Sequence, residues 1–167
     1  MILHCTQKLA NKLSEVSPTP LAEVSQLGSW HAHLYNIDHR QCVIFCHDAS
    51  RYILFLPGLR KDHFADLGSM LRDYFLASLA TLGVKGVPLH RVAMALGPVQ
   101  FDRNTNQSVL ASLRVASSDL SWMLEDINVM DCDPLALSMR LNDRPVTIKG
   151  NWNFSGKVML SLVEHLK

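Results

Sequence analysis

The side chains most suited to chemistry lie in one stretch of this sequence, between Trp30 and Pro57. The stretch holds four of the eight histidines and two of the four cysteines: His31, His33, His39, Cys42, Cys46 and His47. Imidazole nitrogens and thiolates are preferred ligands of zinc, and a thiolate beside a histidine is the nucleophile of many hydrolases. A metal site and a nucleophilic site are therefore the two chemistries to consider here.

Strand geometry decides which of these side chains can meet. If Trp30 and Ala32 share the core face with Val43 and Phe45, the numbers of facing residues must add to an odd number such as 75 or 77. The opposite face then collects a second set of side chains: His31, His33, Tyr35, Cys42, Ile44 and Cys46.

A zinc site is the more specific hypothesis for this second face. Facing side chains in a hairpin lie about 5 Å apart at Cβ, so two histidines and two cysteines could surround one ion. Structural zinc sites, however, draw pairs of ligands from tight knuckles, and Cys42 and Cys46 lie within a predicted flat strand. We therefore expect no metal and no other cofactor. The residues that remain as candidate ligands are His31, His33, Cys42 and Cys46.

A nucleophilic cysteine is less favoured than zinc. Cys46 beside His31 would need a nearby cation or a helix N-terminus to stabilise its thiolate, and a mid-strand position supplies neither. Neighbouring acid and histidine residues, as in His47-Asp48, point to opposite faces of a strand. The chain also lacks a Gly-x-Ser-x-Gly elbow, a phosphate-binding glycine loop and a dinucleotide fingerprint. No catalytic residue is predicted.

A second candidate site lies where a long helix is predicted to begin, after a cluster of polar residues. The first backbone N–H groups of a helix lack partners and favour an anion, and an arginine precedes the cluster. The candidate binding residues are Arg103, Asn104, Asn106 and Ser108. The simpler interpretation is that the asparagines and the serine only cap the helix.

The elements that would position these sites follow from apolar spacing. Three apolar runs separated by short polar turns, residues 30–35, 41–47 and 51–57, predict an antiparallel β-meander. Helical spacing of apolar residues predicts two long amphipathic helices, over 64–82 and 108–127. Shorter elements are expected: strands over 1–5, 98–102 and 146–149, and helices after Thr6 and over 88–96, 134–140 and 155–166.

We therefore expect one α+β domain over residues 1–167, with an antiparallel meander sheet covered mainly on one face by the two long helices. The other face and an open sheet edge would then need cover, which predicts a symmetric homodimer. The alternative is a closed monomer, in which the short N-terminal helix and the segment from Pro134 onward fold over that face. Phe75 and Leu79 fall on the apolar stripe of the first long helix and are expected in the core.

Composition narrows the partners and the location. The formal net charge is +1, with 16 basic and 15 acidic residues, so a dedicated nucleic-acid binder is not expected. No apolar run approaches the roughly 20 residues of a membrane helix, so no membrane partner is expected. The first residues do not resemble a signal peptide, which predicts a cytoplasmic protein with free thiols.

Residues 106–113, Asn-Gln-Ser-Val-Leu-Ala-Ser-Leu, resemble the Asn-Arg-Ser-Val-Leu-Gly-Ser-Met signature of an uncharacterised bacterial family, a domain of unknown function. The chain start, residues 27–30 and 40–45, and the segment Arg-Leu-Asn-Asp-Arg-Pro at 140–145 are similar to other parts of that family. Gln107 and Ala111 replace the Arg and Gly of the signature. The resemblance implies a bacterial, intracellular origin and no particular activity.

The function expected from the sequence is a non-catalytic binding or protein-interaction module. The alternative is a small hydrolase or transferase that uses the Asn106/Ser108 region or the His/Cys face of the hairpin. An enclosed polar pocket at either place would favour the enzyme, whereas an exposed apolar surface would favour the binding module.

Overall fold

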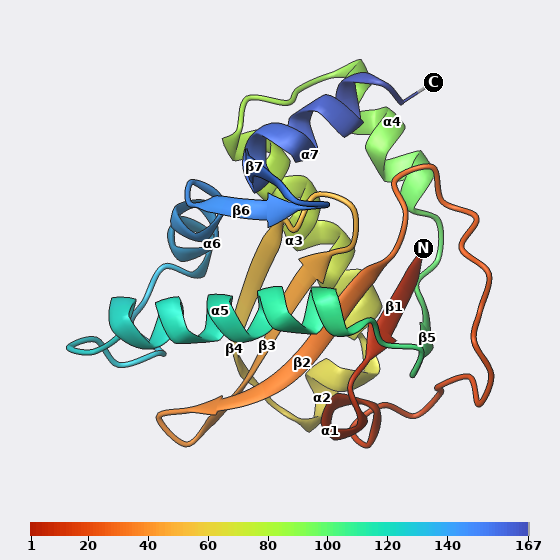
Figure 1. Ribbon diagram of the computed structural model, residues 1–167. Coiled ribbons are helices and arrows are strands. Elements are labelled where there is room, and N and C mark those ends of the chain that lie inside the picture. The colour runs from red at the N-terminus through yellow and green to blue at the C-terminus, as the bar shows by residue number, and fades with distance from the viewer. Residues whose placement is uncertain (167) are drawn as a thin grey trace.

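A mixed five-stranded sheet organises the chain in a computed structural model that describes residues 1–166 (Figure 1). Its strand order is β4-β3-β2-β1-β5. The three central runs form β2 (Trp30–Ile37), β3 (Arg40–His47) and β4 (Ile53–Leu59), which pair antiparallel as predicted. The remaining strands, β1 (Ile2–Cys5) and β5 (Gln100–Asp102), run parallel to their neighbours. The prediction of a purely antiparallel sheet is therefore wrong.

The register of the β2–β3 hairpin follows the odd-sum rule. Trp30 faces His47 and His31 faces Cys46, so the facing numbers add to 77. The strands are joined through Asp38 and His39, both at positive φ, 49° and 60°. Two consecutive positive φ values are the mark of a type I′ turn, whose twist matches that of the strands. The turn thus fixes which side chains reach each face of the sheet.

One face of the sheet packs against α3 (Leu67–Thr81), which follows the short helix α2 (Lys61–Ala65). Trp30 from β2 and Phe75 from α3 are both fully buried, with ring centroids 5.0 Å apart. Leu79 is fully buried in the same core, so the prediction for Phe75 and Leu79 is confirmed. Three further helices cover this side: α1 (Gln7–Ala10), α4 (Val87–Leu96) and α7 (Ser155–Glu164).

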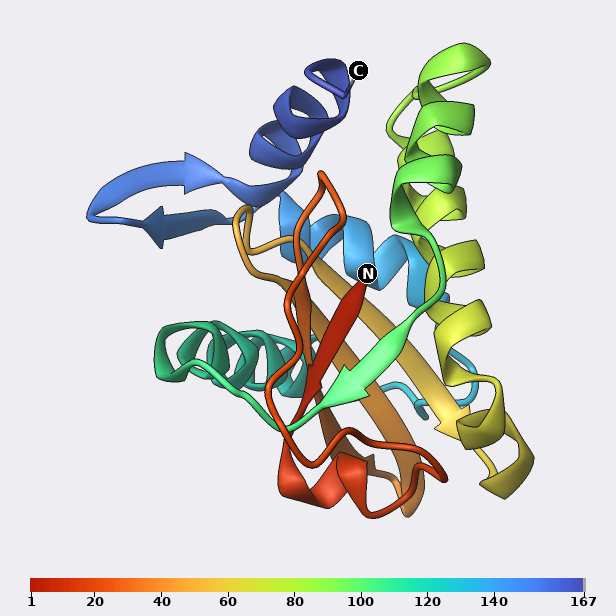
Figure 2. The same ribbon diagram turned by 90° about the vertical axis from the view of Figure 1, so that its right-hand side faces the viewer.

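The opposite face packs against α5 (Gln107–Met123), so the two longest helices lie on opposite sides of the sheet (Figures 1 and 2). Val109 and Leu113 of α5 bury Ile44 and Cys46 of β3. The expectation that both helices cover one face is therefore wrong. Amphipathic spacing shows that a helix covers a sheet, but it does not show which face the connecting chain allows it to reach.

The outer edge of β4 is closed by α6 (Pro134–Asn142). The Asn142 side chain accepts a hydrogen bond from the Ile53 N–H at 2.7 Å and donates one to the Ile53 carbonyl at 2.8 Å. Ser138 Oγ accepts a further bond from the Phe55 N–H at 3.0 Å. Both faces of the sheet and its β4 edge are thus covered within one chain, while β5 forms the other edge.

A separate hairpin, β6 (Pro145–Ile148) and β7 (Asn151–Phe154), projects away from the main sheet near α5 (Figure 2). Its strands pair only with each other, and three of its side chains are exposed: Pro145, Trp152 and Phe154. Among residues 1–166, no helix is both long enough and apolar enough to cross a membrane.

Candidate functional site

The start of α5 is held on the sheet by His31, a residue of β2. The His31 Nδ1–H donates a 2.6 Å hydrogen bond to Asp48 Oδ1, and His31 Nε2 accepts a 2.7 Å bond from the Asn106 N–H. An imidazole that donates at one nitrogen and accepts at the other is neutral, with its proton on Nδ1. Asp48 is held in turn by Ser29, whose Oγ–H donates to Asp48 Oδ2 at 2.7 Å.

A second histidine–aspartate pair lies beside the first. His4 of β1 donates from Nδ1 to Asp102 Oδ1 at 2.5 Å, and its ring lies 4.8 Å from that of His31. Asp102 also accepts hydrogen bonds from the backbone N–H groups of Leu21 and Asn104. His4, His31 and Asp102 are buried and Asp48 is partly exposed, so these two pairs form a largely buried polar network at the start of α5.

The electrostatics of this network favour charged carboxylates. Burial opposes ionisation of Asp48, but hydrogen bonds from His31 and Ser29 prevail and hold the pKa of Asp48 below its ordinary value. Burial likewise opposes ionisation of Asp102, yet the bonds from Leu21, His4 and Asn104 lower its pKa. The network therefore joins the sheet, the loop before β2 and α5 through charge-assisted hydrogen bonds.

The four predicted binding residues lie around this network. Asn106 is the N-cap of α5, and its Oδ1 accepts from the Ser108 N–H at 2.8 Å. The backbone N–H of Asn104 donates a hydrogen bond to the Asp102 carboxylate. Arg103 reaches the side chain of Gln7 instead of the helix start, at 3.3 Å. Ser108 is exposed, and its Oγ accepts a hydrogen bond from the Arg51 guanidinium at 3.0 Å.

The predicted His/Cys face is buried beneath α5 and does not assemble as a ligand set. Cys42 and Cys46 pack in the apolar core of that face, and burial raises the pKa of both thiols, to about 12 for Cys46. His33 bonds Thr6 through Nδ1 at 2.8 Å. Over residues 1–166, no group of three or more His, Cys, Asp or Glu side chains is placed to hold a metal ion.

Sequence reasoning missed His4, Asp48 and Asp102 as members of one network. Alternation in β2 does place His31 on the α5 face, but the pairing with Asp48 depends on how the chain turns after β3. His4 and Asp102 come together because β1 and β5 pair in parallel, with His4 facing Asp102. No local pattern reports a parallel pairing between residues that far apart in sequence.

An open groove of about 470 Å³ lies next to the network, between α5 and the β6–β7 hairpin. We call it the α5–hairpin groove. Its lining comes from one side of α5 and from both hairpin strands, and includes Ser108, Ala111, Val115, Val146, Thr147 and Trp152. Trp152 is 77% exposed and Val115 is 52% exposed. Their exposure on facing sides of one groove gives it an apolar surface.

One cation, Arg144, lines the α5–hairpin groove, and others belong to the hairpin segment or contact a lining residue. Residues 144–157 contain Arg144, Lys149 and Lys157 and no acidic residue. Arg144 lines the groove and is held by Asp119, whose Oδ2 lies 2.7 Å from the Arg144 Nη1 atom. At the other end, Arg51 bonds Ser108. Lys157 lies 5.1 Å above the ring of Phe154, a cation–π distance.

Comparison with known families assigns most of the chain to one family. Residues 2–157 match the family model described as Domain of unknown function (DUF6933), so the chain belongs to this family. The resemblance to an uncharacterised family is thereby confirmed. No curated protein matches the sequence.

Proposed function

We propose that this protein is a non-catalytic protein-interaction module of the bacterial cytoplasm, and that the α5–hairpin groove is its binding surface. The observation that carries the proposal is the exposure of Trp152 opposite Val115 across an open groove. Tryptophan in a partly enclosed apolar site is the residue type that most often dominates the binding energy of protein interfaces.

The hairpin itself supports a binding role. Two-stranded hairpins are marginally stable in water unless a further surface packs on them. Here β6 and β7 pair only with each other, and Trp152 and Phe154 remain exposed. A partner seated in the groove would bury Trp152 and hold the hairpin against α5.

The charge of the surface indicates the kind of partner. Arg144, Lys149 and Lys157 belong to a segment without acidic residues, while the groove lining between them is apolar. An acidic segment of another protein with an apolar face complements both properties. The apolar lining favours this occupant over a nucleic acid, whose binding rests mainly on phosphate contacts.

The alternative of a hydrolase or transferase finds less support. His4, His31 and Asp102 are buried, and His31 has both ring nitrogens engaged. The thiols of Cys42 and Cys46 are buried and their pKa values are raised, which disfavours the nucleophilic thiolate.

A site-specific crosslinking experiment tests the proposal. A photoreactive phenylalanine analogue is placed at Val115 in the groove and, as a control, at Val24, which is 88% exposed and does not line the groove. Crosslinking is carried out in the native host, and the adducts are identified by mass spectrometry. We expect a discrete protein adduct at Val115 that is missing at Val24.

The captured protein is then purified and its affinity is measured by calorimetry. Trp152→Ala is expected to weaken binding about tenfold or more, as for an interface hot spot. Trp122→Ala is the matched control, since Trp122 is 75% exposed but lies outside the groove. Equal effects of the two substitutions, or a nucleic-acid adduct, would contradict the proposal. A second copy of this chain as the sole adduct would instead support the predicted dimer, and sedimentation equilibrium would then give a mass above 18.7 kDa.

A further inference from the structure

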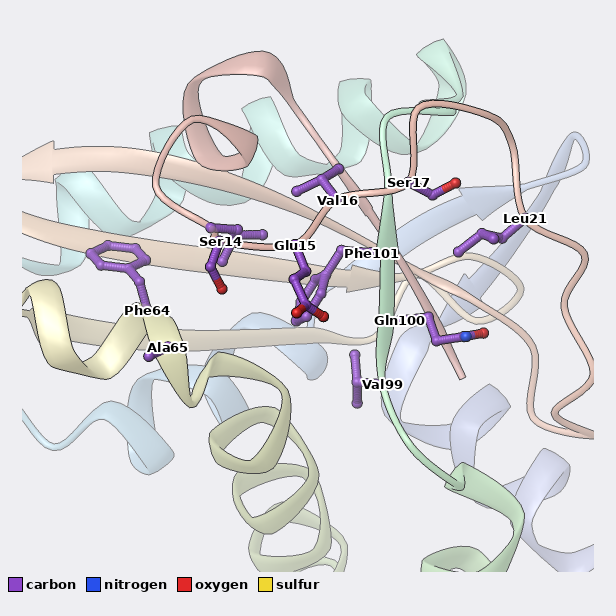
Figure 3. Close-up of a pocket in the computed structure, with 11 residues that line it drawn as sticks. Ser14, Glu15, Val16, Ser17, Leu21, Phe64, Ala65, Val99, Gln100 and Phe101 are labelled. Atoms are coloured by element: carbon purple, nitrogen blue, oxygen red, sulfur yellow. The ribbon is translucent and has the colours of Figure 1, made fainter.

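We propose that a pocket beside β5 binds a small organic cation, an amine or quaternary ammonium group joined to an apolar body. The pocket has a volume of about 560 Å³, within the range of small-molecule sites. Its lining comes from residues 13–17 and Leu21 in the loop after α1, from Phe64 and Ala65 of α2, and from residues 99–101 at β5 (Figure 3). We call it the β5-edge pocket.

The walls of the β5-edge pocket combine apolar and polar surface in nearly equal parts, and the apolar part comes from side chains of the core. Leu13, Val16, Val99 and Phe101 are partly buried, so each packs on the core and still presents surface to the pocket. Phe64 is 4% exposed and closes the side formed by α2. A ligand body with aliphatic or aromatic character would be desolvated against these side chains.

One charge stands among these walls. Glu15 is the only ionisable side chain that lines the pocket, and within residues 1–166 it takes part in no ion pair. Figure 3 shows its carboxylate among the lining residues, between Phe64 on one side and Gln100 on the other. The remaining polar side chains, Ser14, Ser17 and Gln100, are uncharged.

A carboxylate together with aromatic rings selects a cation. The carboxylate attracts an ammonium group and repels an anion, and the faces of phenylalanine rings add a cation–π attraction. The adjoining hollow contains one acid and one base, Asp66 and Arg72, whose opposite charges offset each other. The sign of the ligand is therefore set by Glu15.

The β5-edge pocket shares no lining residue with the α5–hairpin groove. The inference therefore goes beyond the proposed function, and either can fail without the other.

The probe is benzyltrimethylammonium, which carries a fixed positive charge on an apolar body. Phenylacetate, an anion of similar size, and benzyl alcohol, a neutral analogue, are the comparisons. Each is titrated into the full chain labelled with ¹⁵N, and amide shifts are followed by NMR. We expect saturable shifts for the cation at residues 13–17, 64–65 and 99–101, and no saturable shifts there for phenylacetate.

Glu15→Gln removes the charge from an exposed side chain. The variant is expected to stay folded, with an amide spectrum otherwise like that of the wild type. It should weaken binding of the cation about five- to tenfold, as expected for an ion pair and a cation–π contact that are partly open to water. Glu125→Gln is the control, because Glu125 is exposed and does not line this pocket. Raising the salt concentration should weaken binding to the wild type more than binding to Glu15→Gln. Equal binding of phenylacetate, an affinity for the cation unchanged in Glu15→Gln, or shifts outside the pocket alone would overturn the inference.

Discussion

The His31 imidazole accepts a hydrogen bond from the backbone N–H of Asn106 while it donates one to Asp48, at 2.7 Å and 2.6 Å. A neutral ring thus links the backbone at the N-terminus of α5 to the sheet. Because the acceptor nitrogen must carry no proton, this attachment requires the neutral form of His31.

Replacement of His31 by leucine should loosen the start of α5. The substitution leaves the Asn106 N–H without an acceptor and Asp48 without its donor, which should lower the free energy of unfolding by roughly 3 kcal/mol. Denaturant titration measures the loss, and hydrogen exchange should become faster at residues 106–109 than at the end of α5. His33→Leu, which removes a bond to Thr6 only, serves as the comparison. An equal loss in both variants would show that the attachment is not specific.

Acid should destabilise the protein through His47. Burial lowers the pKa of His47 from its ordinary value of 6.5 to about 4, while its Nε2–H donates to the Leu27 carbonyl at 2.6 Å. As the pH falls below 6.5, the unfolded chain takes up a proton that the folded chain refuses. The stability contributed by neutral His47 is therefore complete above pH 6.5 and is lost between pH 6.5 and 4, by about 3 kcal/mol.

Unfolding titrations at several pH values, compared between His47→Gln and the wild type, test this assignment. The variant should be less stable at neutral pH and should show a flatter dependence between pH 6.5 and 4. His90→Gln, which removes an exposed histidine, should keep the wild-type slope. An unchanged slope in His47→Gln would assign the acid sensitivity to other groups.

Truncation of Phe75 should be costly. Its ring is 1% exposed and lies 5.0 Å from that of Trp30 and 6.1 Å from that of Tyr52. Phe75→Ala leaves a cavity and should lower the free energy of unfolding by about 3 to 5 kcal/mol. Asp73→Ala, an exposed position two residues earlier in α3, should change it by less than about 0.5 kcal/mol. A loss below about 1 kcal/mol for Phe75→Ala would be inconsistent with its position in the core.

Thiol reactivity should separate Cys132 from the other three cysteines. Cys5, Cys42 and Cys46 are buried, and burial raises the pKa of Cys5 and Cys46 to about 12. Cys132 is partly exposed. An aromatic disulfide reagent at pH 8 should modify one thiol of the native protein and four after denaturation. In Cys132→Ser these counts should be zero and three, and any rapid native reaction left in that variant would place another thiol at the surface.

The sequence is sufficient to predict the antiparallel strands β2, β3 and β4. It is not sufficient to predict the parallel pairing of β1 and β5. The alternation of Trp30, Ala32 and Leu34 with His31 and His33 determines both faces of β2, and the turn at Asp38 and His39 sets the register. The parallel pairing of β1 with β5 joins residues about 100 positions apart, as in the contact of His4 with Asp102 at a separation of 98. Such pairings depend on the path of the intervening chain and leave no local pattern.

The candidate site likewise has a part that the sequence predicts and a part that it does not. Asn106 and Ser108 were predicted from the preference of these residues for helix starts, and Asn106 is indeed the N-cap of α5. The α5–hairpin groove could not be predicted, because Trp152 reads as one aromatic residue in a short strand. Its significance arises only when β7 is brought beside Val115 of α5.

The closed edge of β4 bears on how this protein resists aggregation. Residues 52–56, Tyr-Ile-Leu-Phe-Leu, are uncharged, lack proline and favour strands, which is the composition of segments that stack into amyloid. In the native state Asn142 and Ser138 occupy the backbone groups that another chain would pair with. Detachment of α6 alone would expose them while the remaining sheet stays folded. The contacts of α6 with β4 therefore shield this segment from pairing with another chain.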